Sequence, residues 1–200
     1  PAGVGAIGVI RLSGPDSIPL VNAVFKPKDL TKQASHTIHY GRIEDAGRVY
    51  DEVVVSLYIA PKSYTKEDVV EISCHGSPFI QESIIQLFVE KGARLARAGE
   101  FTQRAFMHGA FDLAQAEAVA DLIDASSYQA ARSAIKSLQG EFSTLVTQLV
   151  ETMIQLRIYV EAAIDFPEEE IEFLESSKAN ERLASILKKL QDLVEKTQQG

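Results

Sequence analysis

The stretch "VVEISCHGSP", residues 69–78, determines how the first half of this chain folds. Residues 70–75 alternate apolar and polar side chains, which is the period of a half-buried β-strand. Ser77 and Pro78 then supply an N-cap residue and a first-turn proline for a helix, and Gly92 is placed to end it. The stretch therefore predicts a strand followed directly by a helix.

The same alternation assigns different parts to the chemically active residues of this strand. Cys74 shares the apolar face with Val70 and Ile72, so we expect a buried small side chain and no catalytic pair with His75. Glu71 points to the opposite face. It is either exposed to solvent, or it accepts two parallel hydrogen bonds from the edge of a planar heterocycle.

Two further strands are predicted at residues 6–14 and 53–60, and residues 93–97 are expected to be extended again. Because strands and one clear helix alternate in this order, we expect an α/β or α+β fold with a mixed sheet up to about residue 110. Arg11 lies within the first strand. It is either a surface residue or a fixed cation for an anionic ligand.

From Asp112 onward the pattern is helical only. Asp112 and Gln115 have the spacing of a capping box. A second helix is predicted from about Ser126 through Ala163, and at ~1.5 Å per residue its apolar stripe is roughly 48 Å long. Pro167 is expected to end this helix, before a final amphipathic one. Such long apolar stripes are typical of helices that pack on a second subunit or on further chain.

The composition describes a globular chain of 200 residues that is 46% hydrophobic. Its net charge of −8 has the wrong sign for binding nucleic acid through phosphate neutralisation alone. We expect the small basic group of Arg94, Arg97 and Arg104 to be solvated. No stretch approaches the ~20 apolar residues of a membrane span, and a single cysteine fits the reducing cytoplasm.

Several motifs are missing from the sequence. The glycines of "PAGVGAIGVIRLSG", residues 1–14, precede a predicted strand and do not form a dinucleotide-binding turn. There is no phosphate-binding loop, and the histidines lack the spacing of metal ligands. We therefore predict neither catalytic residues nor a metal site in this chain. Its first residue, Pro1, and its last, Gly200, suggest that it is part of a longer protein.

Five blocks of the sequence closely resemble the tRNA modification GTPase family MnmE, also called TrmE. The resemblance covers essentially the whole chain. The blocks are "VGAIGVIRLSG" (4–14), "SYTKEDVVEISCHGSP" (63–78), "GEFTQRAFMHGAFDLAQAEAVADLIDASS" (99–127), "SLQGEFS" (137–143) and "LRIYVEAAIDFPEEEIEFL" (156–174).

This resemblance implies an α+β domain with a mixed sheet, similar to tetrahydrofolate-binding domains, followed by an all-α domain with long helices. Residues 1–111 would bind a one-carbon tetrahydrofolate, in the 5-formyl or 5,10-methylene form, and form a homodimer. Residues 112–200 would be the first part of a central helical domain. In the family that domain is interrupted by the GTPase domain, which holds GTP, potassium and magnesium.

The resemblance also implies partners and an activity for the longer protein. The family works with a flavoprotein, MnmG (GidA), in a heterotetramer, and modifies carbon 5 of the wobble uridine of tRNA. It attaches an aminomethyl or carboxymethylaminomethyl group. The alternative is a non-catalytic dimerisation scaffold with a vestigial folate pocket. A free-standing folate or thiol enzyme is a weaker alternative, because the chain shows no convincing set of acid, base and nucleophile.

Three positions carry over from the family as folate contacts. Arg11 in "VIRLSG" and Glu71 in "VVEISCHG" match the family's arginine and glutamate. Ala110 stands where the family commonly has lysine, and alanine has no charge. Three alternatives follow for this position: Ala110 contributes only its backbone, another cation such as Arg104 substitutes, or folate is held more loosely.

Overall fold

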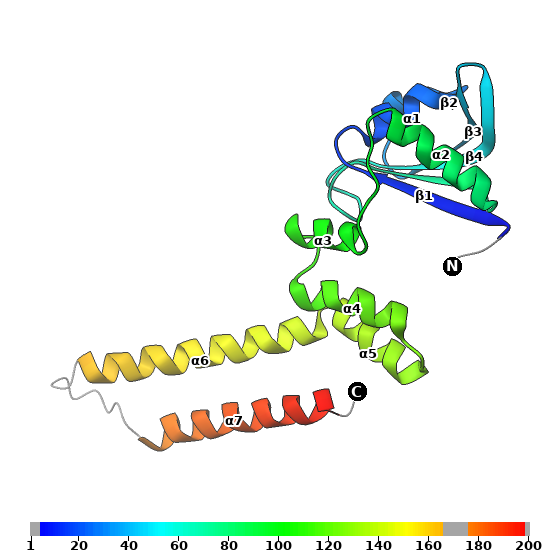
Figure 1. Cartoon of the computed structure of the whole chain (residues 1–200). Coiled ribbons are helices and arrows are strands. Elements are labelled where there is room, and N and C mark those ends of the chain that lie inside the picture. The colour runs from blue at the N-terminus through cyan, green and yellow to red at the C-terminus, as the bar shows by residue number, and fades with distance from the viewer. Residues whose placement is uncertain (1–4, 166–175, 199–200) are drawn as a thin grey trace. The chain divides into compact units, whose positions relative to one another are not determined.

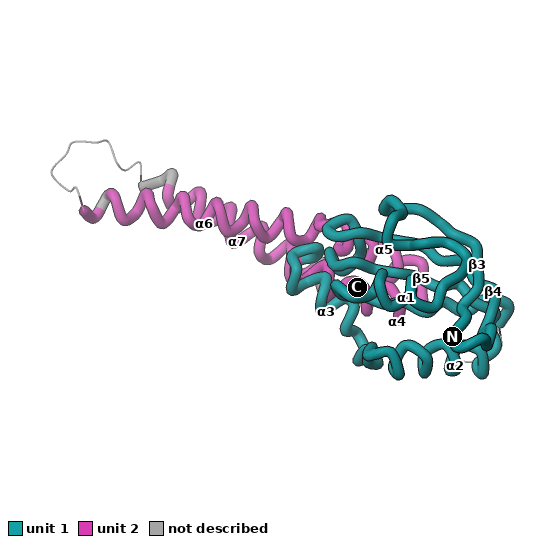
Figure 2. The backbone as a smooth tube through the Cα atoms, turned by 90° about the horizontal axis from the view of Figure 1, so that it is seen from above, with its two compact units in different colours: residues 1–111 teal, residues 112–200 magenta. Residues whose placement is uncertain are grey.

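The computed structural model describes residues 5–165 and 176–198. The chain divides into two compact units, Pro1–Phe111 and Asp112–Gly200 (Figure 2). The first unit contains all of the strands in the described part of the chain, whereas the second is built from helices alone. The α+β class, followed by an all-α region, is confirmed.

A five-stranded sheet forms the first unit (Figure 1). Its strands lie in the order β1-β5-β4-β3-β2, and every pairing between them is antiparallel. The expectation of a mixed sheet was wrong in this respect, because residue patterns predict strands but not the direction in which each one enters the sheet. The strands are β1 (Ile7–Ser13), β2 (Phe25–Lys26), β3 (Thr37–Asp45), β4 (Arg48–Tyr58) and β5 (Val69–His75).

Two helices, α1 (Ser17–Val24) and α2 (Pro78–Glu90), pack against one face of this sheet and share a single hydrophobic core with it. Ser77 is the N-cap residue of α2 and Pro78 its first residue, as predicted. The short helix η1 (Leu30–Lys32) joins the core through its buried first residue. The core side chains of the two helices are Ile18, Val21, Val24, Ile84, Leu87 and Phe88.

The alternation predicted for β5 is confirmed. Val70, Ile72 and Cys74 are buried in the core, whereas Glu71 is half-buried and His75 exposed. The sheet face opposite the helices therefore carries Glu71.

Residues 93–97 do not form a strand, and this prediction was wrong. They lead from α2 to a helix that was not predicted, α3 (Glu100–Met107). The segment has hydrogen-bond partners outside the sheet, since the backbone N–H of Arg97 donates to the carboxylate of Glu100 at 2.8 Å. A strand ladder is consequently not needed to satisfy it.

The second unit contains α4 (Leu113–Asp124), α5 (Tyr128–Leu138), α6 (Glu141–Asp165) and α7 (Ser176–Gln198). The capping box that begins α4 is confirmed. The Asp112 side chain accepts from the Gln115 backbone N–H at 2.9 Å, and the Gln115 side chain accepts from the Asp112 N–H at 3.0 Å.

The single long helix predicted from about Ser126 is wrong, because the helix is interrupted between α5 and α6. Gly140 has a φ of 84°, in the left-handed region that glycine adopts without steric cost. The apolar stripe continues across this break, so periodicity alone did not reveal it. Pro167, the predicted stop for this helix, lies outside the described residues.

Both long helices expose apolar side chains. The exposed residues include Leu145, Val150, Met153, Ile154, Ile158 and Ile164 of α6, with Leu183, Leu187, Leu190 and Val194 of α7. Among the described residues, no helix combines the length and the apolar character needed to cross a bilayer.

Candidate functional site

Arg11 and Glu71 are direct neighbours on the uncovered face of the sheet. They are register partners on β1 and β5, and the guanidinium Nε donates to Glu71 Oε1 at 2.7 Å. Arg11 Nη2 lies 2.6 Å from the same oxygen, while no described residue hydrogen-bonds to Oε2. The two side chains are 38% and 24% exposed, so the pair contributes about 0–1 kcal/mol to stability. A ligand can therefore compete with it at little cost.

Aromatic rings enclose the Arg11 guanidinium. Its central carbon lies 5.4 Å from the ring centroid of Tyr64 and 5.5 Å from that of Phe101, which are cation–π distances. Tyr64 meets Phe111 edge to face, with the ring centroids 5.5 Å apart. The strand β1, the loop before β5, the helix α3 and the turn after it thus bring one cation and three rings together from distant parts of the sequence.

A network of polar side chains lies next to the Arg11 site. The hydroxyl groups of Ser13 and Thr65 lie 2.6 Å apart, and the Ser13 hydroxyl also donates to Glu67 at 2.9 Å. Arg104 Nη1 binds both oxygens of Glu67, at 3.0 and 2.9 Å, and its Nε donates to Glu100 at 3.1 Å. Arg104 is therefore held by two carboxylates, which balance its positive charge. It is not a spare cation for a ligand.

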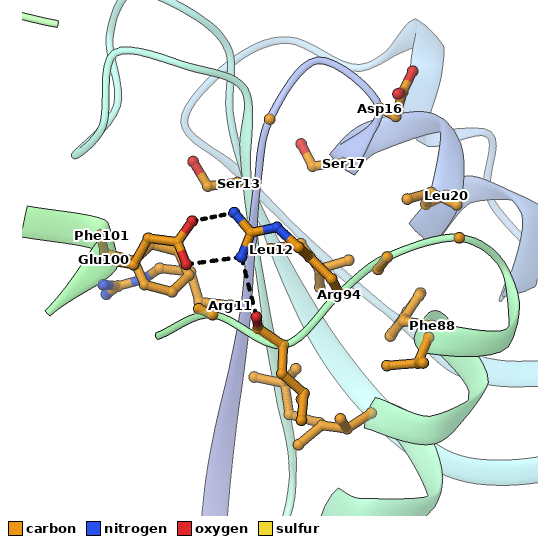
Figure 3. A pocket seen from close by; sticks show the side chains of 18 of the residues that line it. Arg11, Leu12, Ser13, Asp16, Ser17, Leu20, Phe88, Arg94, Glu100 and Phe101 are labelled. Carbon is orange, nitrogen blue, oxygen red and sulfur yellow. Dashed lines mark hydrogen bonds and ion pairs between the residues drawn. The ribbon is translucent and has the colours of Figure 1, made fainter. Parts of the chain in front are cut away.

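Glu100 is the anchor of the segment that precedes α3. Its carboxylate accepts from both terminal nitrogens of Arg94 (Figure 3). It also accepts from the Arg97 backbone N–H and from Arg104. The Arg94 guanidinium, with the Arg97 N–H next in weight, holds the pKa of Glu100 well below its usual range. The expectation that these arginines are solvated holds for Arg94, whose side chain is 62% exposed although it is bonded to Glu100. It was wrong for Arg104, which is half-buried and paired with two carboxylates. The sequence signal for the Glu100–Arg104 ion pair is the four-residue spacing, which brings two side chains to the same face of a helix.

A cavity of about 460 Å³ lies along the outer side of β1 (Figure 3). Its walls come from β1, the start of α1, one side of α2, residues 92–96 and the helix α3. This volume suits a small organic ligand. Arg11 and Phe101 line the cavity, but Glu71 and Ala110 do not. Arg11 consequently stands between the cavity and its partner Glu71.

Ala110 lies in the turn after α3. Its backbone N–H donates to Ala105 at 2.8 Å, so its backbone donor is already used. The carbonyl of the preceding residue, Gly109, accepts from the ammonium group of Lys66 at 2.6 Å. The structure therefore places a lysine beside Ala110 that sequence reasoning missed, because 43 residues separate Lys66 from Gly109.

Cys74 and His75 do not form a catalytic pair, as the alternation predicted. The Cys74 thiol is buried and lies 3.5 Å from the Gly8 carbonyl, and burial, assisted by the negative charge of Asp51, raises its pKa. His75 is exposed, and its Nδ1 lies 2.7 Å from Asp51. A buried thiol with a raised pKa is a poor nucleophile.

Comparison with known proteins gives matches along nearly the whole chain. The family model described as "GTP-binding protein TrmE N-terminus" matches residues 1–110, and the one described as "MnmE helical domain" matches residues 113–200. Proteins named "tRNA modification GTPase MnmE" from Cytophaga hutchinsonii and Flavobacterium johnsoniae are each 48% identical to it, over 194 and 198 residues. These alignments cover 97% and 96% of this chain and 42% of each relative.

A relative of the same name from Francisella philomiragia is 48% identical over 200 residues, which is 100% of this chain and 44% of that protein. The chain thus spans less than half the length of these curated relatives. Because the two family models follow one another along the chain, and relatives of one name match both parts, the chain belongs to the MnmE (TrmE) family.

Proposed function

We propose that this chain is the part of a tRNA modification GTPase that binds a one-carbon tetrahydrofolate and forms a homodimer. The observation that carries the proposal is the placement of Arg11 and Glu71 side by side on the open sheet face, with aromatic rings against the arginine. Membership of the MnmE family supports the same proposal.

The chemistry of the pair suits a folate. A carboxylate matches the amino and ring N–H groups at the edge of a pterin, which donate two parallel hydrogen bonds, and Glu71 Oε2 is available to accept one of them. The Arg11 guanidinium then meets a carbonyl, formyl or carboxylate oxygen of the ligand. Tyr64 and Phe101 provide flat apolar surface for the aromatic parts of the molecule.

The open sheet face also supports dimerisation. One row of register partners across the sheet, Val9, Ser73, Val54 and Tyr40, carries three exposed apolar side chains next to the Arg11–Glu71 row. An apolar row of this kind fits a second copy of the same chain.

The remaining parts of the proposal concern the longer protein. It hydrolyses GTP with magnesium and potassium in a GTPase domain, works with an MnmG-type flavoprotein in a heterotetramer, and modifies the wobble uridine of tRNA in the cytoplasm. The printed names of the relatives, tRNA modification GTPases, support the coarse form of this statement. This chain contributes the folate-binding site and none of the GTPase residues.

The first test is calorimetric titration of the chain with 5-formyltetrahydrofolate, with sedimentation velocity to report its oligomeric state. We expect saturable binding at about one ligand per chain in a dimer. Glu71→Ala should weaken binding by about 1.5 to 3 kcal/mol, the range for a hydrogen bond to a charged group, and should leave the fold unchanged. Glu82→Ala is the matched control, since Glu82 is an exposed carboxylate of the same unit, on the helix α2.

Normal folate affinity in Glu71→Ala removes Glu71 from the site. A well-folded dimer without saturable binding instead supports the scaffold alternative. Two observations favour that alternative enough to keep it: Arg11 and Glu71 already pair with one another, and Ala110 offers no charge.

A further inference from the structure

Lys66 lies in the loop between β4 and β5, and its ammonium group reaches the turn after α3. Its Nζ donates to the carbonyl oxygen of Gly109 at 2.6 Å, immediately before Ala110. Apart from this bond, the side chain of Lys66 is exposed to solvent. A primary ammonium has three donors, so two remain for a ligand.

The backbone around Lys66 is held in place on both sides. Thr65 is fully buried and bound to Ser13, and Glu67 is bound to Arg104. Lys66 itself has a φ of 58°, in the left-handed region that side chains rarely adopt. A lysine in this conformation costs conformational energy, and such residues gather at functional positions. The loop therefore presents the ammonium group at a preset place.

Lys66 also differs from the other cations of this region in its charge balance. Arg11 is paired with Glu71, and Arg104 is paired with Glu67 and Glu100. Within the described residues, the hydrogen bond of the Lys66 ammonium group goes to a neutral carbonyl, and this group forms no ion pair. Its positive charge is consequently uncompensated and favours an anionic group in a ligand.

The contacts connect Lys66 to the proposed folate site in a definite sequence. Arg11 packs on Tyr64, Tyr64 meets the edge of Phe111, and Phe111 follows directly after Ala110, where the Lys66 ammonium lies. The site thus has three consecutive parts: a polar pair of carboxylate and guanidinium, a set of flat aromatic rings, and a cationic ammonium group. A folate has the matching series of pterin, aminobenzoyl ring and glutamate carboxylates.

We propose that Lys66 is a further ligand-binding residue, whose ammonium group binds the carboxylates of the folate glutamate tail. This inference rests on the proposed folate function. In this chain Lys66 provides the charge that Ala110 lacks, and Arg104, held by Glu67 and Glu100, does not have to leave its carboxylates.

The test is calorimetric titration of the full 200-residue chain with 5-formyltetrahydrofolate. Lys66→Met should weaken binding about tenfold, as expected for loss of a hydrogen bond between charged groups. Lys62→Met is the matched control, because Lys62 is an exposed lysine of the same loop, and its affinity should equal that of the wild type. The double variant Lys66→Gly with Ala110→Lys should recover most of the affinity. It restores an ammonium group at the place where the Lys66 side chain meets the turn of Gly109 and Ala110.

A second probe separates charge recognition from a structural effect of the loop. A reduced pterin without the aminobenzoylglutamate tail should bind the wild type and Lys66→Met equally well. Lys66→Gly, which removes the ammonium group and relieves the positive φ, should melt no lower than the wild type but should lose the same tail-dependent affinity.

The outcomes distinguish this inference from the proposed function. Folate binding by the wild type with unchanged affinity in Lys66→Met overturns the role of Lys66 and leaves the folate function standing. An equal loss for the tail-free pterin also overturns it, because the loop would then act through structure. If 5-formyltetrahydrofolate binds neither the wild type nor any of the Lys66 variants, both proposals are overturned.

Discussion

Glu71 and Glu100 are the same residue type in different surroundings, and their surroundings suit one to ligand binding and the other to holding a segment in place. Glu71 has a single partner side chain and is 24% exposed, so it is free to exchange that partner for a ligand. Glu100 is 8% exposed and accepts from two arginine side chains and a backbone N–H. We infer that Glu100 holds the segment around Arg94 and Arg97 in place, and that Glu71 is the recognition residue.

At the residue scale, Glu100→Gln should lower the melting temperature at pH 7, because an amide cannot replace the charge-assisted bonds to Arg94 and Arg104. The variant should also be less sensitive to acid. Since the folded-state pKa of Glu100 is depressed, its contribution is complete above the unfolded value of about 4.3 and is lost as the pH falls toward the folded value.

Thermal unfolding followed by circular dichroism from pH 7 to pH 3 measures both effects. The gap between wild type and Glu100→Gln should narrow below about pH 4. Glu82→Gln, at an exposed position of α2, is the control and should follow the wild type throughout. A gap that stays constant with pH would show that the charge of Glu100 does not stabilise the fold.

At the scale of elements, the break between α5 and α6 decides how the helical unit is built. The N-cap of α5 is Ser127, whose side chain accepts from the Ala130 N–H at 3.1 Å, and the backbone N–H of Gly140 bonds to Ser137 after the helix ends. The turn at Gly140 separates an 11-residue helix from one of 25 residues. One uninterrupted helix would not allow α5 and α6 to have different directions.

Gly140→Ala tests this break. A side chain at a φ of 84° is strained, so we expect the free energy of unfolding to fall by about 1–2 kcal/mol. A methyl group fits the space, because an added Cβ would make an ordinary van der Waals contact with Gln115 Nε2 at 3.5 Å. Urea unfolding measures the change, with Gln139→Ala, at the exposed preceding residue, as the control. If α5 and α6 formed one continuous helix, the same substitution would stabilise the chain by roughly 0.5–1 kcal/mol.

At the scale of the whole molecule, the two compact units suggest that a ligand stabilises one part of the chain selectively. The candidate site draws all of its residues from Pro1–Phe111, which has its own hydrophobic core. Binding energy should therefore be added to the unfolding of this unit, while the helices of Asp112–Gly200 gain little.

Hydrogen exchange measured with and without 5-formyltetrahydrofolate tests this expectation. At a free ligand concentration of about 100 times Kd, peptides from β1 and β5 should gain up to about 2.7 kcal/mol of protection. Peptides from the middle of α6 should remain unchanged and serve as the internal control. Equal protection of α6 would show that the two units unfold together.

Local features of this chain were predictable because they depend on residues close in sequence. The alternation at residues 70–75 predicted the strand and the burial of Cys74. Pro78 and its neighbours predicted α2, and the spacing of Asp112 and Gln115 predicted the capping box. Two of the misses were also local. The helix α1, which the sequence did not predict, is short and contains Pro19, and the apolar stripe passes through Gly140 as if the helix continued.

The sequence by itself determined the α+β and all-α parts, the family, and the identity of Arg11 and Glu71 as candidate contacts. Only the tertiary structure decided that these two residues pair across β1 and β5, that Arg104 is held by two carboxylates, and that Lys66 lies beside Ala110. The physical reason is separation along the chain. Periodicity and caps arise among neighbours, whereas strand order, register and loop contacts join residues tens of positions apart, and no local pattern encodes which of them meet.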